Sequence, residues 1–419
     1  MEIKDLYKLY LKDFLVDTDT RNIRKNSIFF ALKGENFNGN TFAEKALELG
    51  AKYAVVDEKQ ETDNKSILLV DDVLETLQKL ANYHRRQLNI PFIGLTGSNG
   101  KTTTKELINS VLSKKYKTLA TKGNLNNHIG VPLTLLSILP EHEIVIIEMG
   151  ANHQKEIEFL SSICEPDFGY ITNFGKAHLE GFGGIEGVIK GKSELYTYLK
   201  KNNKIAFINP KDEIQLEKTK DIKSIKFDSK NIKCMDVNPF IKIAFKDEII
   251  QSNLIGKYNF TNIVAALTIG EYFKISDENL KKGIEDYIPE NNRSQIIETK
   301  TNKIILDAYN ANPSSMKVAL ESFNLLNAKN KVVILGDMFE LGNESETEHQ
   351  SIVDYANTLC IEHQIFVGEH FFKAKTKQQK FKNFENLKNY LETNKVENST
   401  ILIKGSRGMR LERALELFS

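Results

Sequence analysis

The chain has 419 residues, of which 41% are hydrophobic and 27% charged, and its formal net charge is +1. These values are typical of a globular protein with room for about three domains, and they predict neither a nucleic-acid nor a membrane partner. Three widely spaced cysteines, Cys164, Cys234 and Cys360, form no CxxC pair, which argues against a disulfide framework or a zinc site and favours the reducing cytoplasm. No run of about 18 apolar residues occurs, and charged residues interrupt residues 1–15, so we expect neither a membrane span nor a signal peptide.

Residues 1 to about 88 alternate predicted strands and helices, which indicates a small α/β unit. The strand candidates are Ser27–Leu32, Tyr53–Val56 and Ile67–Val70, and the helix candidates are Thr41–Leu49 and Val73–Arg86. No catalytic constellation is visible in this unit. It either holds a substrate for a neighbouring catalytic domain or has a purely structural role.

A glycine-rich loop organises the central part of the chain. An apolar run leads into Thr96–Thr104 and an amphipathic run leads out, which predicts strand, loop and helix. The N-terminus of such a helix binds the phosphates of a nucleotide. Gly97 and Gly100 allow the backbone to curl, Lys101 can reach the β- and γ-phosphates, and the Thr102 hydroxyl can ligate Mg²⁺.

The loop departs from the full eight-residue phosphate-loop pattern, because Leu95 stands where the first glycine belongs. The prediction therefore rests on the strand–loop–helix context and on the Gly-Lys-Thr triplet. The alternative is a glycine turn with an exposed lysine.

Two further strands of the central region end near candidate ligand groups. Ile144–Ile147 ends at Glu148, and a carboxylate at the C-terminal end of a parallel strand lies where such sheets bind ligands. Glu148 is therefore a candidate to hold Mg²⁺ beside Thr102. The strand Phe168–Thr172 leads into a glycine-spaced stretch with His178, which is either a metal ligand or structural.

The rest of the central region is less informative. From the sequence alone, Lys192 is a helix-surface lysine. Residues 200–255 are rich in lysine and contain short alternating stretches at Ile241–Phe245 and Ile249–Ile250, which indicate edge strands.

Two asparagines stand near the start of an apolar helix at Ile263–Tyr272. Either Asn259 or Asn262 is able to cap this helix or to contact the edge of a base through its amide group. Arg293 follows near the next domain boundary.

The last region, from about residue 297, alternates strands and helices and is predicted to be a third, doubly wound α/β unit. Its predicted elements are strands Lys303–Asp307, Val332–Leu335, Ile365–Val367 and Ile401–Ile403, and helices Ser314–Leu326, His349–Cys360 and Leu411–Leu417. Asn312 before Pro313 is a good N-cap. Polar residues at two strand ends, Asp307–Asn312 and Lys404–Arg407, lie where such sheets bind ligands.

Eight stretches together resemble the motifs of the Mur ligase family. They are Thr96–Thr104, Gly123–Asn127, Glu148–His153, Thr172–Phe182, Gly191–Leu195, Tyr309–Pro313, Leu335–Met338 and Lys404–Gly408. The resemblance implies an α/β fold of three domains: a small N-terminal domain at 1–88 that binds the UDP-linked substrate, a central P-loop doubly wound sheet at 89–296, and a Rossmann-like C-terminal domain at 297–419. The Tyr309–Pro313 and Lys404–Gly408 stretches are similar to those of members that add a dipeptide.

The resemblance also implies a reaction. ATP phosphorylates the terminal carboxylate of UDP-N-acetylmuramoyl-tripeptide, and D-Ala-D-Ala attacks the acyl phosphate. By resemblance, Lys101, His178 and Lys192 are catalytic, and two Mg²⁺ ions take part. Thr102 and Glu148 hold one ion, while His178 holds the second together with a carbamate that Lys192 forms with CO₂. The resemblance implies a cytoplasmic enzyme. We expect it to be a monomer whose partners are small molecules only.

The implied binding residues lie in all three regions. ATP contacts are implied for Gly97, Ser98, Asn99, Gly100, Lys101, Thr102, Thr103, Asn259, Asn262, Arg293 and Asp307. Substrate contacts are implied for Ser27 and Asn127 and, around the dipeptide, for Asn310, Asn312, Lys404, Ser406 and Arg407. Asp19–Arg21 joins Ser27 on the uridine side.

The chain departs from the family at two places. Asn38-Gly39-Asn40 stands where relatives have Asp-Gly-His, and His128 stands where an acidic residue is common. No role is carried over to His128, Asn38 or Asn40. The departure at Asn38-Gly39-Asn40 implies contacts around the uridine diphosphate that differ from those of relatives.

Two other functions fit parts of the pattern. One is a different ligase of the superfamily, which adds a single amino acid or acts like folylpolyglutamate synthase; the N-terminal unit and Tyr309–Pro313 argue against it. The other is a nucleotide-binding switch, against which His178 and Lys192 stand because a switch needs no second metal site. The third residue of the tripeptide, diaminopimelate or lysine, depends on pocket shape and stays open.

Overall fold

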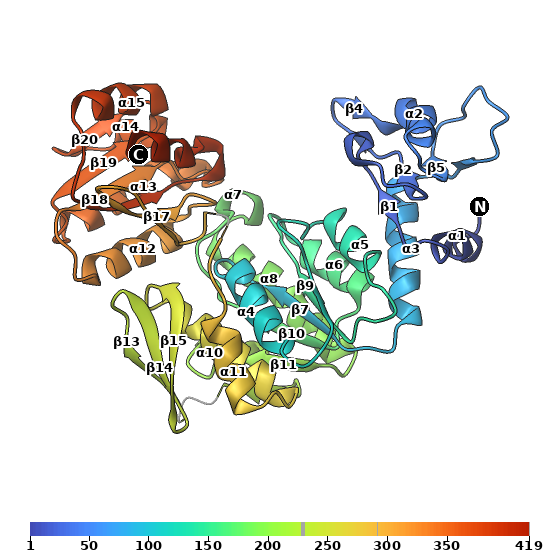
Figure 1. The fold of residues 1–419 in the computed structure, drawn as a ribbon, viewed down its shortest axis with the longest axis horizontal. Helices are drawn as coiled ribbons and strands as arrows, with labels where there is room; N and C mark the ends of the chain where they lie inside the picture. Colours follow the sequence, from blue (N-terminus) through green and yellow to red (C-terminus); the bar gives the residue numbers. More distant parts are fainter. Residues whose placement is uncertain (228–230, 291, 419) are drawn as a thin grey trace.

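A computed structural model describes residues 1–227, 231–290 and 292–418. Figure 1 shows three α/β domains, with the N- and C-terminal domains on the same side of the central domain and apart from each other. The predicted three-domain α/β architecture is confirmed. Within the described ranges, no helix has the length and apolar character needed to cross a bilayer.

The N-terminal domain is built on a parallel sheet of order β1-β2-β5-β6, with the β3-β4 hairpin beside it. Its elements are α1 (Ile3–Tyr10), β1 (Val16–Asp17), β2 (Ile28–Phe30), β3 (Lys33–Gly34), β4 (Phe37–Asn38), α2 (Ala43–Glu48), β5 (Tyr53–Val56), β6 (Ile67–Leu69), α3 (Val73–Gln87) and the 3₁₀ turns η1 (Thr20–Asn22) and η2 (Gly39–Phe42). Helix α1 is tied to the central domain by the Tyr10 hydroxyl, which donates to the Leu136 carbonyl at 3.1 Å. Buried residues of α1 and α3 share one core with the central domain.

The central domain is built on a parallel six-stranded sheet of order β12-β11-β10-β7-β9-β8. Its elements are β7 (Phe92–Thr96), α4 (Lys101–Leu112), β8 (Thr118–Ala120), α5 (Gly130–Leu135), β9 (Ile144–Glu148), α6 (Glu156–Cys164), β10 (Phe168–Ile171), α7 (Leu179–Phe182), α8 (Ile185–Lys201), β11 (Ile205–Ile208), α9 (Glu213–Lys218), β12 (Ser224–Lys226), α10 (Asn259–Tyr272) and α11 (Asp277–Glu285). Strands β7 and β9 are apolar and buried along their length, as strands covered on both faces are. Their register pairs Leu95 with Glu148, so both strands deliver their C-terminal residues to one edge.

A separate antiparallel sheet of three strands follows the central sheet, with order β13 (Ile232–Asp236), β14 (Phe240–Phe245) and β15 (Glu248–Ile255). Both predicted strands are present, and Ile249–Ile250 lies in β15, which is an edge strand of this sheet as predicted. The prediction of an edge strand at Ile241–Phe245 is wrong, because β14 is the middle strand of the sheet. Alternating hydrophobicity identifies a strand with one solvated face, but it does not identify the partner. A register shift between Cys234 and Asp236 interrupts the pairing of β13 with β14.

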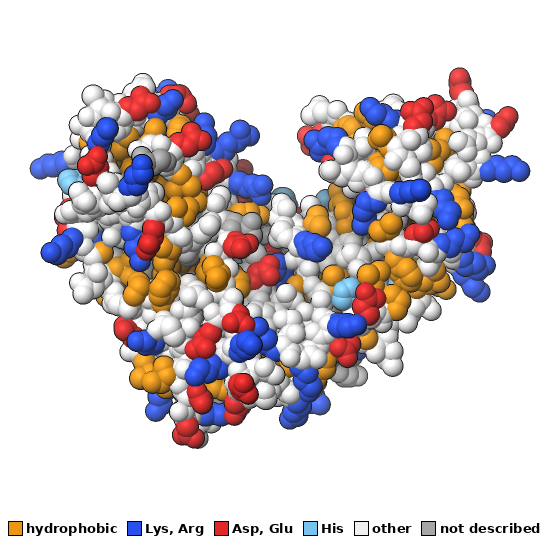
Figure 2. All heavy atoms as spheres, in the orientation of Figure 1, with side chains coloured by type: hydrophobic (Ala, Val, Ile, Leu, Met, Phe, Trp, Pro, Cys, Tyr) orange, Lys and Arg blue, Asp and Glu red, His pale blue; other side chains and the backbone are white. Residues whose placement is uncertain are grey.

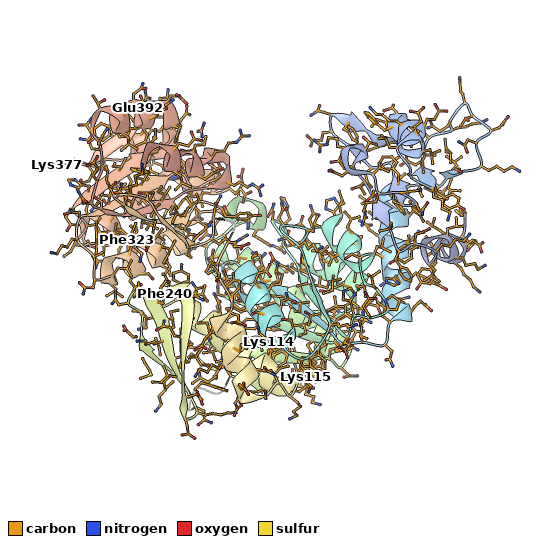
Figure 3. All side chains as sticks on the ribbon, viewed as in Figure 1. Lys114, Lys115, Phe240, Phe323, Lys377 and Glu392 are labelled. Atoms are coloured by element: carbon orange, nitrogen blue, oxygen red, sulfur yellow. The ribbon has the colours of Figure 1, made fainter. Side chains whose placement is uncertain are left out.

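The three-stranded sheet also contacts the C-terminal domain. The Asn238 amide group donates to the Leu325 carbonyl at 3.2 Å and accepts from the Asn327 N–H at 2.9 Å, at the C-terminal end of α12. Figure 3 labels Phe240 on this sheet and Phe323 on α12, and both side chains belong to one apolar cluster. This contact joins the three-stranded sheet to the C-terminal domain.

The C-terminal domain is a six-stranded sheet of order β16-β17-β21-β18-β19-β20, in which β16 alone is antiparallel to its neighbour among the described strands. Its elements are β16 (Gln295–Glu298), β17 (Lys303–Asp307), α12 (Pro313–Leu325), β18 (Lys331–Gly336), η3 (Gly342–Glu344), α13 (Ser345–Asn357), β19 (His363–Val367), α14 (Glu369–Lys373), β20 (Gln379–Phe381), α15 (Phe384–Thr393), β21 (Thr400–Lys404), η4 (Arg407–Met409) and η5 (Leu411–Phe418). The expected boundary at 296/297 falls inside β16, which joins this sheet. The predicted helix Leu411–Leu417 is a 3₁₀ helix.

Candidate functional site

The glycine-rich loop turns tightly between β7 and α4. Gly97 and Gly100 have φ values of +140° and +78°, in the left-handed region that favours glycine. A Cβ atom on Gly97 would lie 2.0 Å from the Thr172 hydroxyl oxygen, so no side chain fits between the loop and the end of β10. Because α4 begins at Lys101, its N-terminus faces the loop, as an anion site requires.

Lys101 is folded back over the loop. Its Nζ donates to the Gly97 carbonyl at 2.7 Å and to the Ser98 carbonyl at 3.3 Å. Burial lowers the pKa of Lys101, the Glu148 carboxylate opposes this shift, and the positive charge of Arg293 adds to it. Lys101 and Arg293 thus converge on one region, where a polyanion would relieve their repulsion. The alternative of a glycine turn with an exposed lysine is wrong.

The hydroxyl and the carboxylate expected beside the loop contact each other. Thr102 Oγ1 donates to Glu148 Oε2 at 2.9 Å, and the Asn126 amide donates to Glu148 Oε1 at 2.8 Å. Glu148 is 1% exposed, and its backbone N–H donates to the Thr121 hydroxyl at 2.9 Å. A hydroxyl and a carboxylate held together in this way are oxygen ligands that suit Mg²⁺.

His178 lies at the boundary between the central and C-terminal domains. Its φ of +53° is left-handed, and it directly precedes α7. The imidazole Nδ1 is hydrogen-bonded to the Glu340 carboxylate of the C-terminal domain, and this bond lowers the pKa of Glu340. Nearby, the Lys176 ammonium pairs with Glu348 at 2.5 Å. The loop that carries His178 is therefore held by the C-terminal domain.

Lys192 is fully buried on α8, so its interpretation as a helix-surface lysine is wrong. Its Nζ donates to the Ala151 carbonyl at 2.9 Å and lies 4.9 Å from the centre of the Phe182 ring. Burial brings the pKa of Lys192 well below that of an ordinary lysine; the charge of Lys101 acts in the same direction, and two glutamates oppose it. In the described ranges, no group of three or more His, Cys, Asp or Glu side chains is placed to hold a metal ion.

One cavity of about 820 Å³ unites the central and C-terminal parts of the site, and Figure 2 shows this face hollowed between the outer domains. The predicted residues that line it are Ser98, Asn99, Gly100, Lys101, Thr102, Thr103, Asn127, Glu148, His178, Asn259, Asn262, Arg293, Asp307, Asn310, Asn312 and Lys404. The predicted residues outside its lining are Ser27, Gly97, Lys192, Ser406 and Arg407.

Asn259 and Asn262 are buried beside the loop. The Asn259 amide donates to the Ile255 carbonyl at 2.9 Å, and the Asn262 amide donates to Asn259 Oδ1 at 2.8 Å. Neither side chain caps α10, whose N-cap is Tyr258, because the helix begins earlier than predicted. A Cβ on Gly100 would lie 3.0 Å from Asn262 Oδ1, so this pair packs directly against the phosphate loop.

The C-terminal domain contributes paired polar groups to the cavity. Lys404 Nζ donates to Asp307 Oδ2 at 2.6 Å and to the Asn310 carbonyl at 3.2 Å. Asn312 caps α12 through a capping box with Ser315, as its position before Pro313 predicts. Its amide also donates to Asn99 Oδ1 at 2.7 Å, so the cap of α12 contacts the phosphate loop across the domain boundary.

Ser406 and Arg407 lie just beyond these residues. Ser406 is buried, and its hydroxyl accepts from the Phe339 N–H at 3.0 Å. Arg407 is exposed, and its guanidinium donates to the Tyr309 hydroxyl at 3.3 Å. Ser406 therefore supports the protein's own backbone, whereas Arg407 contacts Tyr309, which lines the cavity.

Three family models match consecutive parts of the chain: "Mur ligase family, catalytic domain" at 15–85, "Mur ligase middle domain" at 95–270 and "Mur ligase, glutamate ligase domain" at 292–407. The UDP-N-acetylmuramoyl-tripeptide–D-alanyl-D-alanine ligase of Bacillus subtilis is 33% identical over 422 residues, which cover 96% of this chain and 92% of that protein. The chain belongs to the Mur ligase family. The Escherichia coli protein of the same name matches this Mur ligase with 33% identity and the same coverage of both chains.

Solved structures agree with this assignment. A crystal structure of MurF from Acinetobacter baumannii matches this Mur ligase with a TM-score of 0.86 and 31% identity, over 96% of this chain and 92% of the other. MurF ligase from Thermotoga maritima, in complex with ADP, matches with a TM-score of 0.84 and 27% identity, over 97% and 98%. Mycobacterium tuberculosis folylpolyglutamate synthase, complexed with ADP and AMPPCP, shares the fold with a TM-score of 0.60, over 83% and 95%, but its identity is only 12%.

The N-terminal domain of this Mur ligase explains one family departure. The side-chain Oδ1 of Asn40 accepts from the backbone N–H groups of Asp57 and Glu58, and its Nδ2 donates to the Asp57 carboxylate at 2.8 Å. Asn40 is 1% exposed, so it braces the end of β5. Ser27 is also buried, and its hydroxyl has no hydrogen-bond partner among the described residues.

A second cavity of about 300 Å³ lies between the N-terminal and central domains of this Mur ligase. Asp19 lines it, and the adjacent Arg21 guanidinium pairs with the Asp19 carboxylate at 2.6 Å. His128 lines the main cavity instead, and Asn127 beside it accepts from the backbone N–H of Gly130 at 2.9 Å.

Four functional candidates were not found by sequence reasoning. Asn126 braces Glu148, Glu340 holds His178, Tyr309 contacts Arg407, and Lys105 is a fully buried lysine on α4. Asn126 lies in the asparagine-rich stretch after β8, which was a usable signal. Tyr309 lies in the Tyr309–Pro313 stretch, but its role was not predicted because Arg293 and Arg407 meet it only in the folded sheet. Glu340 carried no local signal, because His178 is distant in the sequence.

Proposed function

We propose that this chain catalyses the ATP-dependent joining of D-alanyl-D-alanine to UDP-N-acetylmuramoyl-tripeptide, with formation of ADP, in peptidoglycan precursor synthesis. The observation that carries the proposal is the cavity in which Lys101, Thr102 and Glu148 of the central domain face Arg293 and Lys404. Relatives named for this reaction match over nearly their whole length, which supports the choice of substrates.

The phosphate side of the cavity suits both steps of such a ligation. Phosphoryl transfer to a carboxylate and attack on the acyl phosphate both gather negative charge. Lys101 and Arg293 both line this cavity, and fixed positive charges at such a site stabilise the developing negative charge. Thr102 and Glu148 would hold Mg²⁺, which supplies charge neutralisation and orients the phosphate oxygens.

For the second Mg²⁺, we propose His178 and a carbamate on Lys192. A neutral amine adds to CO₂, forming an N–C bond and releasing a proton, and the product presents two oxygens that a hard cation prefers. Burial favours the neutral form of Lys192, which supports this role. Lys192 does not itself line the cavity, but its Nζ contacts the carbonyl of Ala151, which does. A carbamate on Lys192 would therefore lie next to the cavity.

The remaining substrate groups are assigned by domain. We propose that Asn310, Asn312, Lys404 and Arg407 surround the dipeptide, with Ser406 behind them, and that Asn259, Asn262 and Asp307 contact the nucleotide. Asn127 would contact the tripeptide part of the UDP-linked substrate. The cavity beside Asp19 is the candidate uridine site, with Ser27 behind it. That the enzyme is a monomer and acts in the cytoplasm stays a prediction.

The test is a mass-spectrometric product assay. The enzyme is incubated with ATP, Mg²⁺, D-Ala-D-Ala and UDP-N-acetylmuramoyl-tripeptide carrying either diaminopimelate or lysine, and single D-alanine serves as the comparison acceptor. We expect a UDP-pentapeptide and ADP with one of the tripeptides, and much slower turnover with D-alanine. Equal rates with the two amines would contradict the assignment to dipeptide ligation.

A further inference from the structure

Tyr309 is contacted by two arginines at once. The Arg293 guanidinium carbon lies 3.7 Å from the centre of the Tyr309 ring, and that of Arg407 lies 5.2 Å from it. Arg407 Nη1 also donates to the Tyr309 hydroxyl at 3.3 Å. The Tyr309 ring therefore connects Arg293, which lines the main cavity, to Arg407, which does not.

The three residues are carried by adjoining strand ends. Arg293 lies just before β16, Tyr309 just after β17, and Arg407 just after β21. Strand β17 pairs with β16 on one side and with β21 on the other, and the Ser294 N–H donates to Asp307 Oδ1 at 3.3 Å. One sheet therefore holds all three residues in a fixed arrangement.

The stacking arrangement leaves Arg293 available for an anion. In residues 1–227, 231–290 and 292–418, no carboxylate pairs with the Arg293 guanidinium, whose partner is the Tyr309 ring. A guanidinium stacked on an aromatic face keeps its N–H edge free for bidentate contacts. Arg293 and the phosphate-loop residues Ser98 to Thr103 line the same cavity, so the free edge of Arg293 is available to an anion bound there.

We propose that Tyr309 is a positioning residue that aims Arg293 at the phosphates of ATP and Arg407 at the carboxylate of the incoming dipeptide. This inference rests on the proposed function. One ring then supports both contacts. Loss of the ring therefore weakens the binding of both ATP and the dipeptide, whereas loss of the hydroxyl alone weakens only the binding of the dipeptide.

Two variants separate the ring from the hydroxyl. Tyr309→Phe keeps the stack and removes the hydrogen bond to Arg407, and we expect about a threefold rise in the KM for D-Ala-D-Ala with the KM for ATP unchanged. Tyr309→Leu removes both, and we expect the KM for ATP to rise about fivefold as well, the scale of a cation–π contact. Unchanged KM values in Tyr309→Leu would overturn the proposal, even with a lower Tm.

Phe384→Leu is the matched control, because Arg413 stacks on Phe384 at 4.0 Å in the same domain but Phe384 does not line the cavity. We expect it to leave both KM values unchanged. A purely structural role for Tyr309 would lower Tm and the active fraction in the same way as this control.

Failure of the proposed function is recognised separately, because the wild-type enzyme would then give no pentapeptide product. In that case, the binding of a non-hydrolysable ATP analogue, measured by calorimetry, still tests whether Tyr309 positions Arg293 for the nucleotide. We expect about fivefold weaker binding for Tyr309→Leu and unchanged binding for Tyr309→Phe. Binding by Tyr309→Leu equal to that of wild type would overturn the positioning role.

Discussion

The two halves of the proposed metal site differ in how they are assembled. Thr102 and Glu148 come from one domain and already contact each other at 2.9 Å. His178 and Lys192 instead have separate protein partners, the Glu340 carboxylate of another domain and the Ala151 carbonyl. Neighbouring strand ends of a parallel sheet bring ligands together during folding, whereas the second half depends on a domain contact and on a chemical modification.

The largest effect is expected in the preassembled half. Lys101→Ala should lower kcat/KM about a thousandfold, or about 4 kcal/mol, because it removes a fixed charge from the transferring phosphate. Circular dichroism and Tm should stay close to wild type, since the hydrogen bonds that the Lys101 ammonium makes to the described residues go to the Gly97 and Ser98 carbonyls of the loop. Lys115→Ala, just beyond α4, is the control and should retain full activity. Retained turnover in Lys101→Ala would mean that the loop is not the ATP site.

In the second half, Lys192→Arg should lower kcat about a hundredfold, because arginine cannot supply a carbamate ligand for the second ion. With ¹³C-bicarbonate, the wild-type enzyme should give a carbamate NMR signal that is absent from the variant. Lys190→Arg, an exposed neighbour on the same helix, should keep both the activity and the signal. A labelled signal that persists in Lys192→Arg would remove the basis for the second metal site.

The same residue predicts a pH dependence of stability. In CO₂-depleted buffer, Lys192→Met should raise the free energy of unfolding by about 2 kcal/mol at pH 7, because it replaces a buried amine with an apolar side chain. The lysine pKa is about 10.4 in the unfolded chain and well below that in the folded one, so unfolding takes up a proton between the two values. Wild-type stability therefore rises with pH in this window, and the advantage of the variant should shrink toward pH 10. Urea unfolding at pH 7 and pH 9 checks the sign.

The contact between His178 and Glu340 should affect metal affinity moderately. A carboxylate bound to Nδ1 orients a histidine for metal binding through Nε2, so Glu340→Gln should raise the Mg²⁺ concentration for half-maximal rate about tenfold. Glu348→Gln breaks the neighbouring ion pair with Lys176 and should leave the Mg²⁺ requirement unchanged. A lower requirement in Glu340→Gln would show that Glu340 competes with the ion.

The smallest effect is expected at the contact between the phosphate loop and the N-cap of α12. Asn312→Ser keeps an N-cap for α12 but removes the amide that reaches Asn99, and kcat/KM should fall about threefold. Asn383→Ser replaces the N-cap of α15 and should leave kinetics unchanged. An unchanged kcat/KM in Asn312→Ser would mean that the contact across the domain boundary does not assist catalysis.

The sequence predicted the parts of the site that local pattern determines. The strand, loop and helix around Lys101 follow from hydrophobic period and glycine spacing, and the position of Glu148 follows from the end of a buried strand. The cap at Asn312 was equally local. These features need no knowledge of distant partners.

Features set by tertiary contact were missed or misread. Lys192 has the neighbours of a surface lysine in sequence, but α8 turns it into the core. Glu340 and Tyr309 acquire their roles only when the C-terminal domain meets the central one or when its own strand ends align. The strands at 240–255 were recognised from the sequence. Their assembly into a separate sheet was not, because alternating hydrophobicity does not specify which strands pair with each other.

The interrupted strand β13 has a consequence for how the protein behaves at high concentration. An outermost strand exposes a row of unpaired backbone groups that can recruit a strand from another molecule. Here the register shift between Cys234 and Asp236 breaks that row, and Lys233 and Asp236 place exposed charges along it. A neighbouring molecule finds no continuous template along β13, so this edge of the sheet resists edge-to-edge aggregation.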